Sequence, residues 1–107
     1  MQIADKMNWE KLALPNPNAN VSGGYAGDLL SWVMSRAEEG QIWVTIMTNI
    51  NILAVASLVG VSAIVVADGA EISSEIIDKA HELGINLFRS KLSTFDIACA
   101  IGRELEI

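Results

Sequence analysis

The chain has 107 residues, and its 13 acidic and 7 basic side chains give a formal net charge of −6 at neutral pH. This length allows one domain, here residues 1–107, and the negative charge opposes binding to nucleic acids or to anionic membranes. One cysteine excludes an internal disulfide, and no stretch has the features of a signal peptide or a membrane span. We therefore expect a soluble, cytoplasmic protein.

The first 28 residues predict short elements joined by an exposed loop. Ile3 and Met7 lie four residues apart, which is typical of a short helix, and residues 11–14 can form a strand. Residues 15–20 carry two prolines and three asparagines and predict a loop. Residues 21–28 are rich in glycine and predict a turn or a short strand, with positive φ angles or close backbone approach. The direction of strands in this part is not fixed by the sequence.

A helix is expected over residues 29–37. Asp28 is a good N-cap for it, because a carboxylate accepts hydrogen bonds from free backbone N–H groups. Two sets of apolar residues, Leu29, Trp32 and Val33, and Leu30, Val33 and Ala37, recur at three- and four-residue spacing, so this helix should lie on the sheet.

Residues 40–69 predict a β-α-β unit, around which the rest of the chain is organised. Two β-branched runs, at residues 41–46 and 63–67, are typical of buried strands. Residues 49–59 between them are long enough for a helix of three turns. Because parallel strands need such a crossover, we expect the two strands to be parallel.

The remaining residues continue the alternation. Residues 74–84 predict an amphipathic helix that Ser73 or Ser74 caps and Gly84 ends. Residues 85–89 predict a strand, and a last helix runs from Ser93 to Glu104. Its expected apolar stripe consists of Phe95, Ala98, Ile101 and Leu105. The whole pattern predicts a three-layer α/β/α fold with a mostly parallel central sheet of about four to five strands.

In open α/β sheets, ligands bind beyond the carboxyl ends of the strands, where helix N-termini converge. Hydroxyl and amide side chains there can donate to a phosphate or a ribose, and Lys91 and Arg89 can supply positive charge. The alternative is that these side chains only cap helices. The candidate ligand-binding residues are Thr45, Thr48, Asn49, Asp68, Gly69, Lys91, Ser93 and Thr94, and a glycine-rich turn adds Gly23, Gly24, Tyr25 and Asp28.

Catalytic and metal-binding motifs are absent from the sequence. It has no phosphate-binding loop and no dinucleotide-binding glycine pattern. His81 is the only histidine and is expected on the surface, while Cys99 lies in an apolar run and is expected in the core. We therefore predict no catalytic residue, no metal, no cofactor and no enzymatic activity.

Several motifs together resemble the DRTGG domain family over essentially the whole chain. They are Val21-Ser22-Gly23-Gly24-Tyr25, Asp28-Leu29-Leu30-Ser31, Gly40, the strand with Thr45, Asn49-Ile50, Ala54-Val55-Ala56, Ala63-Ile64, Gly69 and Ser93-Thr94-Phe95-Asp96. The sequence departs from the family where Asn20-Val21-Ser22 replaces the Asp-Arg-Thr before Gly23-Gly24, so no role of that arginine carries over.

The resemblance implies a fold like that of the N-terminal domain of HPr kinase/phosphorylase, and a regulatory or dimerising role. Such domains accompany CBS pairs in regulated pyrophosphatases, and small standalone members occur beside iron-hydrogenase subunits. The composition, with three Trp and four Met, also favours a covered apolar surface. The leading hypothesis is a non-catalytic homodimeric regulatory or scaffolding module, accessory to a metabolic or redox enzyme subunit such as an iron hydrogenase. The alternative is a sensor that binds an adenine or uridine nucleotide at the carboxyl edge of the sheet.

Overall fold

The computed structural model describes all 107 residues, Met1 to Ile107, and contains one five-stranded sheet with the strand order β1-β5-β4-β3-β2. The elements in chain order are α1 (Gln2–Lys6), β1 (Glu10–Ala13), β2 (Gly23–Ala26), α2 (Leu30–Arg36), β3 (Gln41–Thr45), α3 (Asn51–Val59), β4 (Ala63–Val66), α4 (Ser74–Leu83), β5 (Leu87–Arg89) and α5 (Thr94–Glu104). Strands β2 to β5 are parallel, and β1 is antiparallel to β5. The predicted, mostly parallel α/β fold is confirmed.

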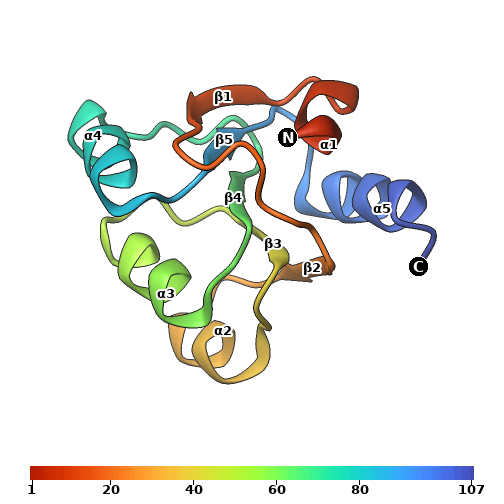
Figure 1. Cartoon of the computed structure of the whole chain (residues 1–107), viewed down its shortest axis with the longest axis horizontal. Coiled ribbons are helices and arrows are strands. Elements are labelled where there is room, and N and C mark those ends of the chain that lie inside the picture. The colour runs from red at the N-terminus through yellow and green to blue at the C-terminus, as the bar shows by residue number, and fades with distance from the viewer.

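The helices form a layer on each side of the sheet (Figure 1). Helices α2, α3 and α4 lie on one side, and α1 and α5 lie on the other. Successive side chains of a strand point to opposite faces, and so Trp43 and Ile64 join the core under α2–α4, whereas Ile42 and Val65 join the core under α1 and α5. All four of these side chains are fully buried, which explains why β3 and β4 read as continuous apolar runs.

The first forty residues supply both edge strands. Strand β1 pairs with β5 through Glu10 opposite Arg89, and β2 pairs in parallel with β3 at the other edge. The expected loop of residues 15–20 is held by the buried Asn86, whose amide donates to the carbonyl oxygens of Asn16 at 2.8 Å and Ser62 at 3.0 Å. The side-chain oxygen of Asn86 accepts from the Asn16 N–H at 3.0 Å.

Helix α4 follows its sequence prediction closely. Ser73 is its N-cap and accepts from the Ile76 N–H at 3.4 Å, and Gly84 ends it in the left-handed conformation with φ 74°. Other elements are shorter than predicted. Strand β3 ends at Thr45, α3 begins at Asn51, β4 ends at Val66, β5 begins at Leu87, and α1 ends at Lys6.

The prediction for the helix after Asp28 is wrong about its cap and about part of its buried face. The N-cap residue is Leu29, with no side-chain capping bond, because the Asp28 carboxylate bonds to β3 instead. The helix packs on the core through Leu30, Val33 and Ala37, as one of the two predicted sets requires. The other set is wrong at Leu29 and Trp32, which are more than half exposed. The Arg36 guanidinium lies 4.0 Å above the Trp32 ring, so a cation on the same helix covers part of this indole.

The predicted apolar stripe of α5 is also partly wrong. Ile97, Ala100 and Ile101 face the sheet, while Phe95 is 74% exposed and Ala98 is exposed as well. Cys99, expected in the core, is only half-buried. Phe95 and Ala98 therefore face away from the domain's own core.

Candidate functional site

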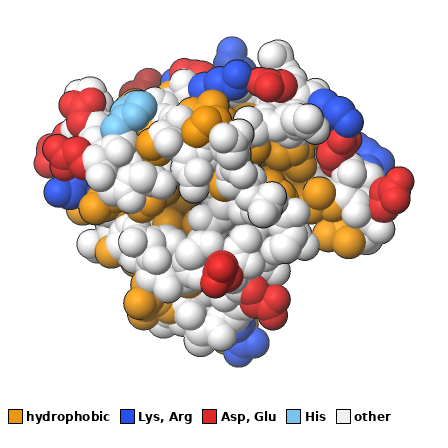
Figure 2. All heavy atoms as spheres, viewed as in Figure 1, with side chains coloured by type: hydrophobic (Ala, Val, Ile, Leu, Met, Phe, Trp, Pro, Cys, Tyr) orange, Lys and Arg blue, Asp and Glu red, His pale blue; other side chains and the backbone are white.

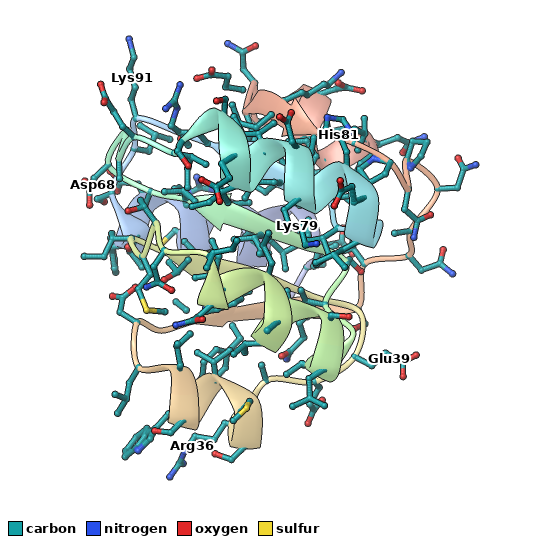
Figure 3. All side chains as sticks on the ribbon, turned by 90° about the vertical axis from the view of Figure 1, so that its left-hand side faces the viewer. Arg36, Glu39, Asp68, Lys79, His81 and Lys91 are labelled. Atoms are coloured by element: carbon teal, nitrogen blue, oxygen red, sulfur yellow. The ribbon has the colours of Figure 1, made fainter.

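Four loops meet at the carboxyl edge of the parallel strands, where the sequence places a ligand. They follow β2, β3, β4 and β5 and lead into α2, α3, α4 and α5. Figure 3 shows Asp68 and Lys91 on this edge, with Glu39 on the opposite side of the molecule. His81 is exposed on α4, as expected.

Thr45 and Asp28 bond to each other at this edge. The fully buried Thr45 hydroxyl donates to Asp28 Oδ1 at 2.7 Å, and the Ile46 N–H donates to the same oxygen at 2.9 Å. The Thr45 oxygen also accepts from the Met47 N–H at 3.2 Å. These bonds fix the β3–α3 loop against the segment before α2, so the Thr45 hydroxyl proton and this oxygen of Asp28 are not available to a ligand.

Asp68 and Gly69 form a left-handed turn, with φ 58° and 63°. Their N–H groups donate to the carbonyl oxygens of Leu92 and Ser90, each at 2.8 Å, and the Ser90 N–H donates to Val66 O. The loops after β4 and β5 are thus joined by backbone hydrogen bonds beyond the strand ends. The N–H groups that a phosphate would need at this turn are already used.

Two more predicted site residues serve local turns. Ser93 is the N-cap of α5 and accepts from the Asp96 N–H at 3.1 Å. Asn49 accepts from the Asn51 N–H at 2.9 Å, one residue before the N-cap of α3. The half-buried Thr48 and Thr94 make no side-chain hydrogen bond within the chain, so their hydroxyl groups remain able to bind a ligand.

A hollow of about 600 Å³ lies at the β5 and β1 side of this edge, and Lys91 is part of its lining. Arg89 also lines it, but its guanidinium donates to both carboxylate oxygens of Glu10, at 3.0 and 2.9 Å. This hydrogen bonding raises the pKa of Arg89 above its ordinary value. Lys91 has no ion pair in the chain. The lining residues are Met7, Asn8, Glu10, Gly69, Glu71, Arg89, Ser90, Lys91 and Leu92.

The acidic side of this hollow was missed by the sequence prediction. Glu10 comes from β1, whose direction was not fixed, and Glu71 comes from the β4–α4 loop. Only the antiparallel register of β1 on β5 places Glu10 beside Arg89. The hollow therefore carries both signs of charge, and Lys91 is its one unpaired cation.

The glycine-rich segment is a strand and not a turn. Gly23, Gly24 and Tyr25 belong to β2, and the glycines with positive φ are Gly40, Gly60, Gly69 and Gly84. The expectation of positive φ is therefore wrong for this segment. Close approach holds for Gly24, where an added Cβ would lie 3.3 Å from Ile101 Cγ2 of α5.

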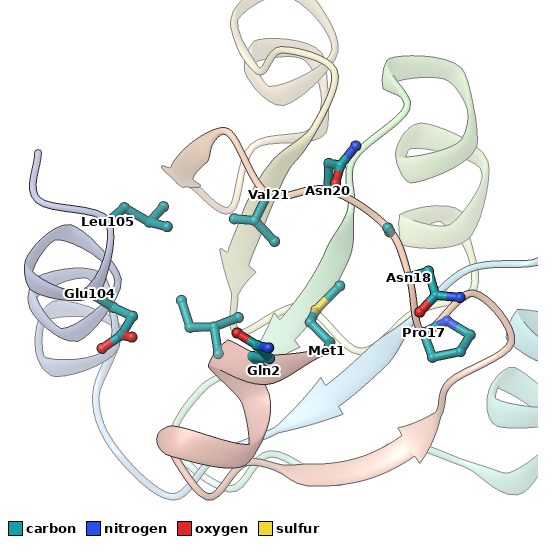
Figure 4. Close-up of a pocket in the computed structure, with 10 residues that line it drawn as sticks. Met1, Gln2, Pro17, Asn18, Asn20, Val21, Glu104 and Leu105 are labelled. Atoms are coloured by element: carbon teal, nitrogen blue, oxygen red, sulfur yellow. The ribbon is translucent and has the colours of Figure 1, made fainter.

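Another hollow, of about 470 Å³, lies away from the predicted site, between α1, the 17–21 loop and the end of α5 (Figure 4). Gln2, Asn18, Asn20 and Glu104 contribute polar side chains to it. Glu104 pairs with Lys6, so its charge is compensated. None of the predicted site residues lines this hollow.

Two further observations concern metal binding and membrane spans. No three histidine, cysteine or acidic side chains come together in a way that could hold a metal ion. None of the helices combines the length and the apolar character needed to cross a bilayer.

Comparison with known proteins extends these observations. No family model matches the chain, and no curated protein matches it. Among solved structures, the chain is similar to the CBS and DRTGG domains of the regulatory region of Clostridium perfringens pyrophosphatase, complexed with the activator diadenosine tetraphosphate. The TM-score is 0.76 at 21% sequence identity, over 92% of this chain and 44% of the other. At this identity the likeness concerns the fold, and it confirms the DRTGG-like fold that the motifs predicted.

Proposed function

We propose that the chain is a non-catalytic regulatory module that acts as a homodimer. The observation that carries this proposal is the set of large apolar side chains left in solvent, because a second copy that covers some of them removes apolar surface from water. Phe95 and Leu58 are 74% and 73% exposed. The full set is Leu29, Trp32, Met34, Ile46, Ile50, Leu58, Leu83, Leu92, Phe95 and Ile107.

The carboxyl edge supports the non-catalytic part of the proposal. Thr45 and Ser93 are engaged in local hydrogen bonds, and the N–H groups of Asp68 and Gly69 are bonded to the neighbouring loop. Among the candidate residues, a hydroxyl within hydrogen-bond reach of a carboxylate occurs at Thr45 and Asp28, but Thr45 is fully buried, so its hydroxyl cannot reach a substrate. The role that remains is to bind a partner and alter its activity.

The regulated partner is proposed from likeness alone. The similar pyrophosphatase segment belongs to a regulatory region, and the DRTGG resemblance includes proteins beside iron-hydrogenase subunits. We therefore propose a metabolic or redox enzyme, such as an iron hydrogenase, as the partner. Co-purification of a tagged chain with its native enzyme subunit, compared with a tagged unrelated protein of similar charge, tests this association.

Dimerisation has a direct test. Light scattering coupled to gel filtration, from low to high micromolar concentration, should give twice the 11.5 kDa chain mass. A constant monomer mass over that range would contradict the proposal.

A second candidate function is nucleotide sensing, which the unpaired Lys91 beside a 600 Å³ hollow favours. Thr48 and Thr94 offer free hydroxyl groups at the same edge. The pyrophosphatase region of similar fold was crystallised with diadenosine tetraphosphate, but it contains CBS domains as well, and this chain spans 44% of it.

Calorimetry separates this candidate from the first. Adenine and uridine nucleotides and diadenosine tetraphosphate should release heat with the native chain, and Lys91→Ala and Thr48→Ala should weaken binding. Lys79→Ala is the matched control, because Lys79 lies on α4 and pairs with Glu82. Absence of heat for every nucleotide, or equal loss in Lys79→Ala, would remove nucleotide sensing.

A further inference from the structure

The outward side of α5 is an unusual surface for an amphipathic helix. Its buried side consists of Ile97, Ala100 and Ile101. Its opposite side, called here the outer face of α5, consists of Phe95, Ala98, Cys99 and Gly102. No charged residue interrupts these four positions, and three of them are small. A second helix could approach this face closely.

An apolar pocket of about 110 Å³ adjoins the C-terminal half of this face, between α5 and β2. Ala98 and Gly102 line it from the helix, and Tyr25 and Ala26 line it from the strand. Strand β2 is an edge strand that pairs only with β3, so no other strand covers this side. Figure 1 shows α5 and β2 bordering the same side of the molecule, and Figure 2 shows hydrophobic side chains along the lower border of α5.

Opposite charges flank the same face. Asp96 lies in the first turn of α5 and Arg103 in its last turn, and both are exposed. Each charge suits the dipole of its own helix, but neither has an ion-pair partner within the chain. Lys6 pairs with Glu104 and leaves Arg103 free.

The apolar pair and the charged pair on α5 have the same sequence spacing. Phe95 precedes Gly102, at the pocket, by seven residues, and Asp96 precedes Arg103 by the same number. Seven residues are two helical turns, or roughly 10 Å along the axis. When two identical helices cross antiparallel about a two-fold axis near Cys99, each Phe95 lies at the partner's pocket. Each Asp96 then lies beside the partner's Arg103.

We infer that the outer face of α5, with the adjoining edge of β2, is the surface through which two copies of this chain associate. This inference rests on the proposed homodimer and specifies its interface. A two-fold interface uses the same patch on both copies, so the patch must be complementary to itself. An aromatic side chain paired with an apolar pocket, and an acidic residue paired with a basic one, meet that requirement. The other exposed aromatic residue of the helices, Trp32, is already stacked by Arg36.

Sedimentation equilibrium of charge-reversal variants tests this register. Asp96→Arg places arginine beside arginine twice per dimer, and Arg103→Asp does the same with carboxylates. Each should weaken the dimer by roughly tenfold or more, and the double variant should recover most of the loss, because it restores opposite charges. A role of these residues in folding alone would not be rescued by exchanging them.

Phe95→Asp tests the apolar contact and should raise the dissociation constant by roughly thirtyfold or more. Leu58→Asp is the matched control, because Leu58 is equally exposed but lies on α3, on the other side of the sheet. Circular dichroism verifies that each variant is folded. In addition, mild oxidation of the native dimer should produce a disulfide-linked dimer through Cys99, since facing residues at a close helix crossing come within disulfide range.

The outcomes distinguish the two levels of the proposal. A native chain that is monomeric at every concentration would overturn both the homodimer and this interface. A native dimer that Phe95→Asp and Asp96→Arg leave intact, or that Leu58→Asp disrupts instead, would overturn the α5 interface alone. Weakening by both single charge reversals without recovery in the double variant would overturn the antiparallel register.

Discussion

The Thr45 hydroxyl donates to Asp28 Oδ1 at 2.7 Å, and this hydrogen bond closes the carboxyl end of β3 onto the segment that leads into α2. Thr45 is fully buried, and the same carboxylate oxygen accepts from the Ile46 N–H. Two residues predicted as parts of a ligand site and a glycine-rich turn therefore serve together to hold two loops in place.

Removal of the Asp28 carboxylate should destabilise the domain. Asp28→Ala leaves the buried Thr45 hydroxyl and the Ile46 N–H without their acceptor, so we expect a loss of about 1–3 kcal/mol in the free energy of unfolding. Thr45→Val should lower the free energy of unfolding by less in the Asp28→Ala variant than in the native chain, because the two changes remove the same hydrogen bond. Urea denaturation at fixed protein concentration measures both. Asp78→Ala, at an exposed position of α4, is the control, and an equal effect there would contradict the assigned role.

Asn86 should be among the most sensitive polar positions. Its side chain makes three hydrogen bonds to backbone groups of Asn16 and Ser62 and is almost fully buried. Asn86→Ala leaves those backbone groups without hydrogen-bond partners, and we expect the free energy of unfolding to fall by about 2–4 kcal/mol. Hydrogen exchange should also speed up in the 15–20 loop. Asn51→Ala, on the exposed side of α3, should change stability by less than about 0.5 kcal/mol; similar losses for the two variants would refute this reading.

Gly40 and Gly84 provide a matched pair. Both have positive φ, 85° and 74°, but an added Cβ would meet Ser22 Oγ at 2.8 Å only at Gly40, and nothing within 4 Å at Gly84. Gly84→Ala should cost about 1 kcal/mol from backbone strain alone. Gly40→Ala should cost more, because Ser22 must also move. Thermal unfolding of the two variants shows which loses more stability. A larger loss in Gly84→Ala than in Gly40→Ala would contradict the predicted clash with Ser22.

Asp5 and Lys11 form an exposed ion pair at 2.7 Å that links α1 to β1. The hydrogen bond and charge of Lys11 lower the pKa of Asp5 below its ordinary value. The folded pKa is therefore below the unfolded value of about 3.9. The ion pair therefore stabilises the fold at pH values above the unfolded pKa of Asp5. This stabilisation is lost as the pH falls through the folded pKa.

Lys11→Met should accordingly raise the pKa of Asp5 toward its ordinary value, which a carboxyl-carbon NMR titration measures. Lys79→Met, on the distant α4, should leave Asp5 unchanged. An Asp5 titration that is the same in Lys11→Met and in the native chain would show that the pair does not form in solution.

The parts of the fold that sequence predicts well depend on local signals. The β-branched runs of β3 and β4 and the caps of α4 at Ser73 and Gly84 need no knowledge of distant residues. The predicted stripe of α5 is partly wrong because Phe95 and Ala98 are apolar on a side that faces outward. Spacing alone does not distinguish an apolar face that packs on the sheet from one that is exposed.

The candidate site was less predictable for a physical reason. The rule for α/β sheets locates the carboxyl edge, but whether a side chain there is free depends on partners far along the chain. Asp28 is 17 residues from Thr45, and Glu10 is 79 residues from Arg89. These hydrogen bonds follow from strand order and register, which the first forty residues did not reveal.

The mass of the native chain in solution tests the central proposal most directly. Light scattering should give twice 11.5 kDa at micromolar concentration, and Phe95→Asp should shift that mass toward the monomer. A native mass of one chain at every concentration would contradict the account of this domain as a homodimeric regulatory module.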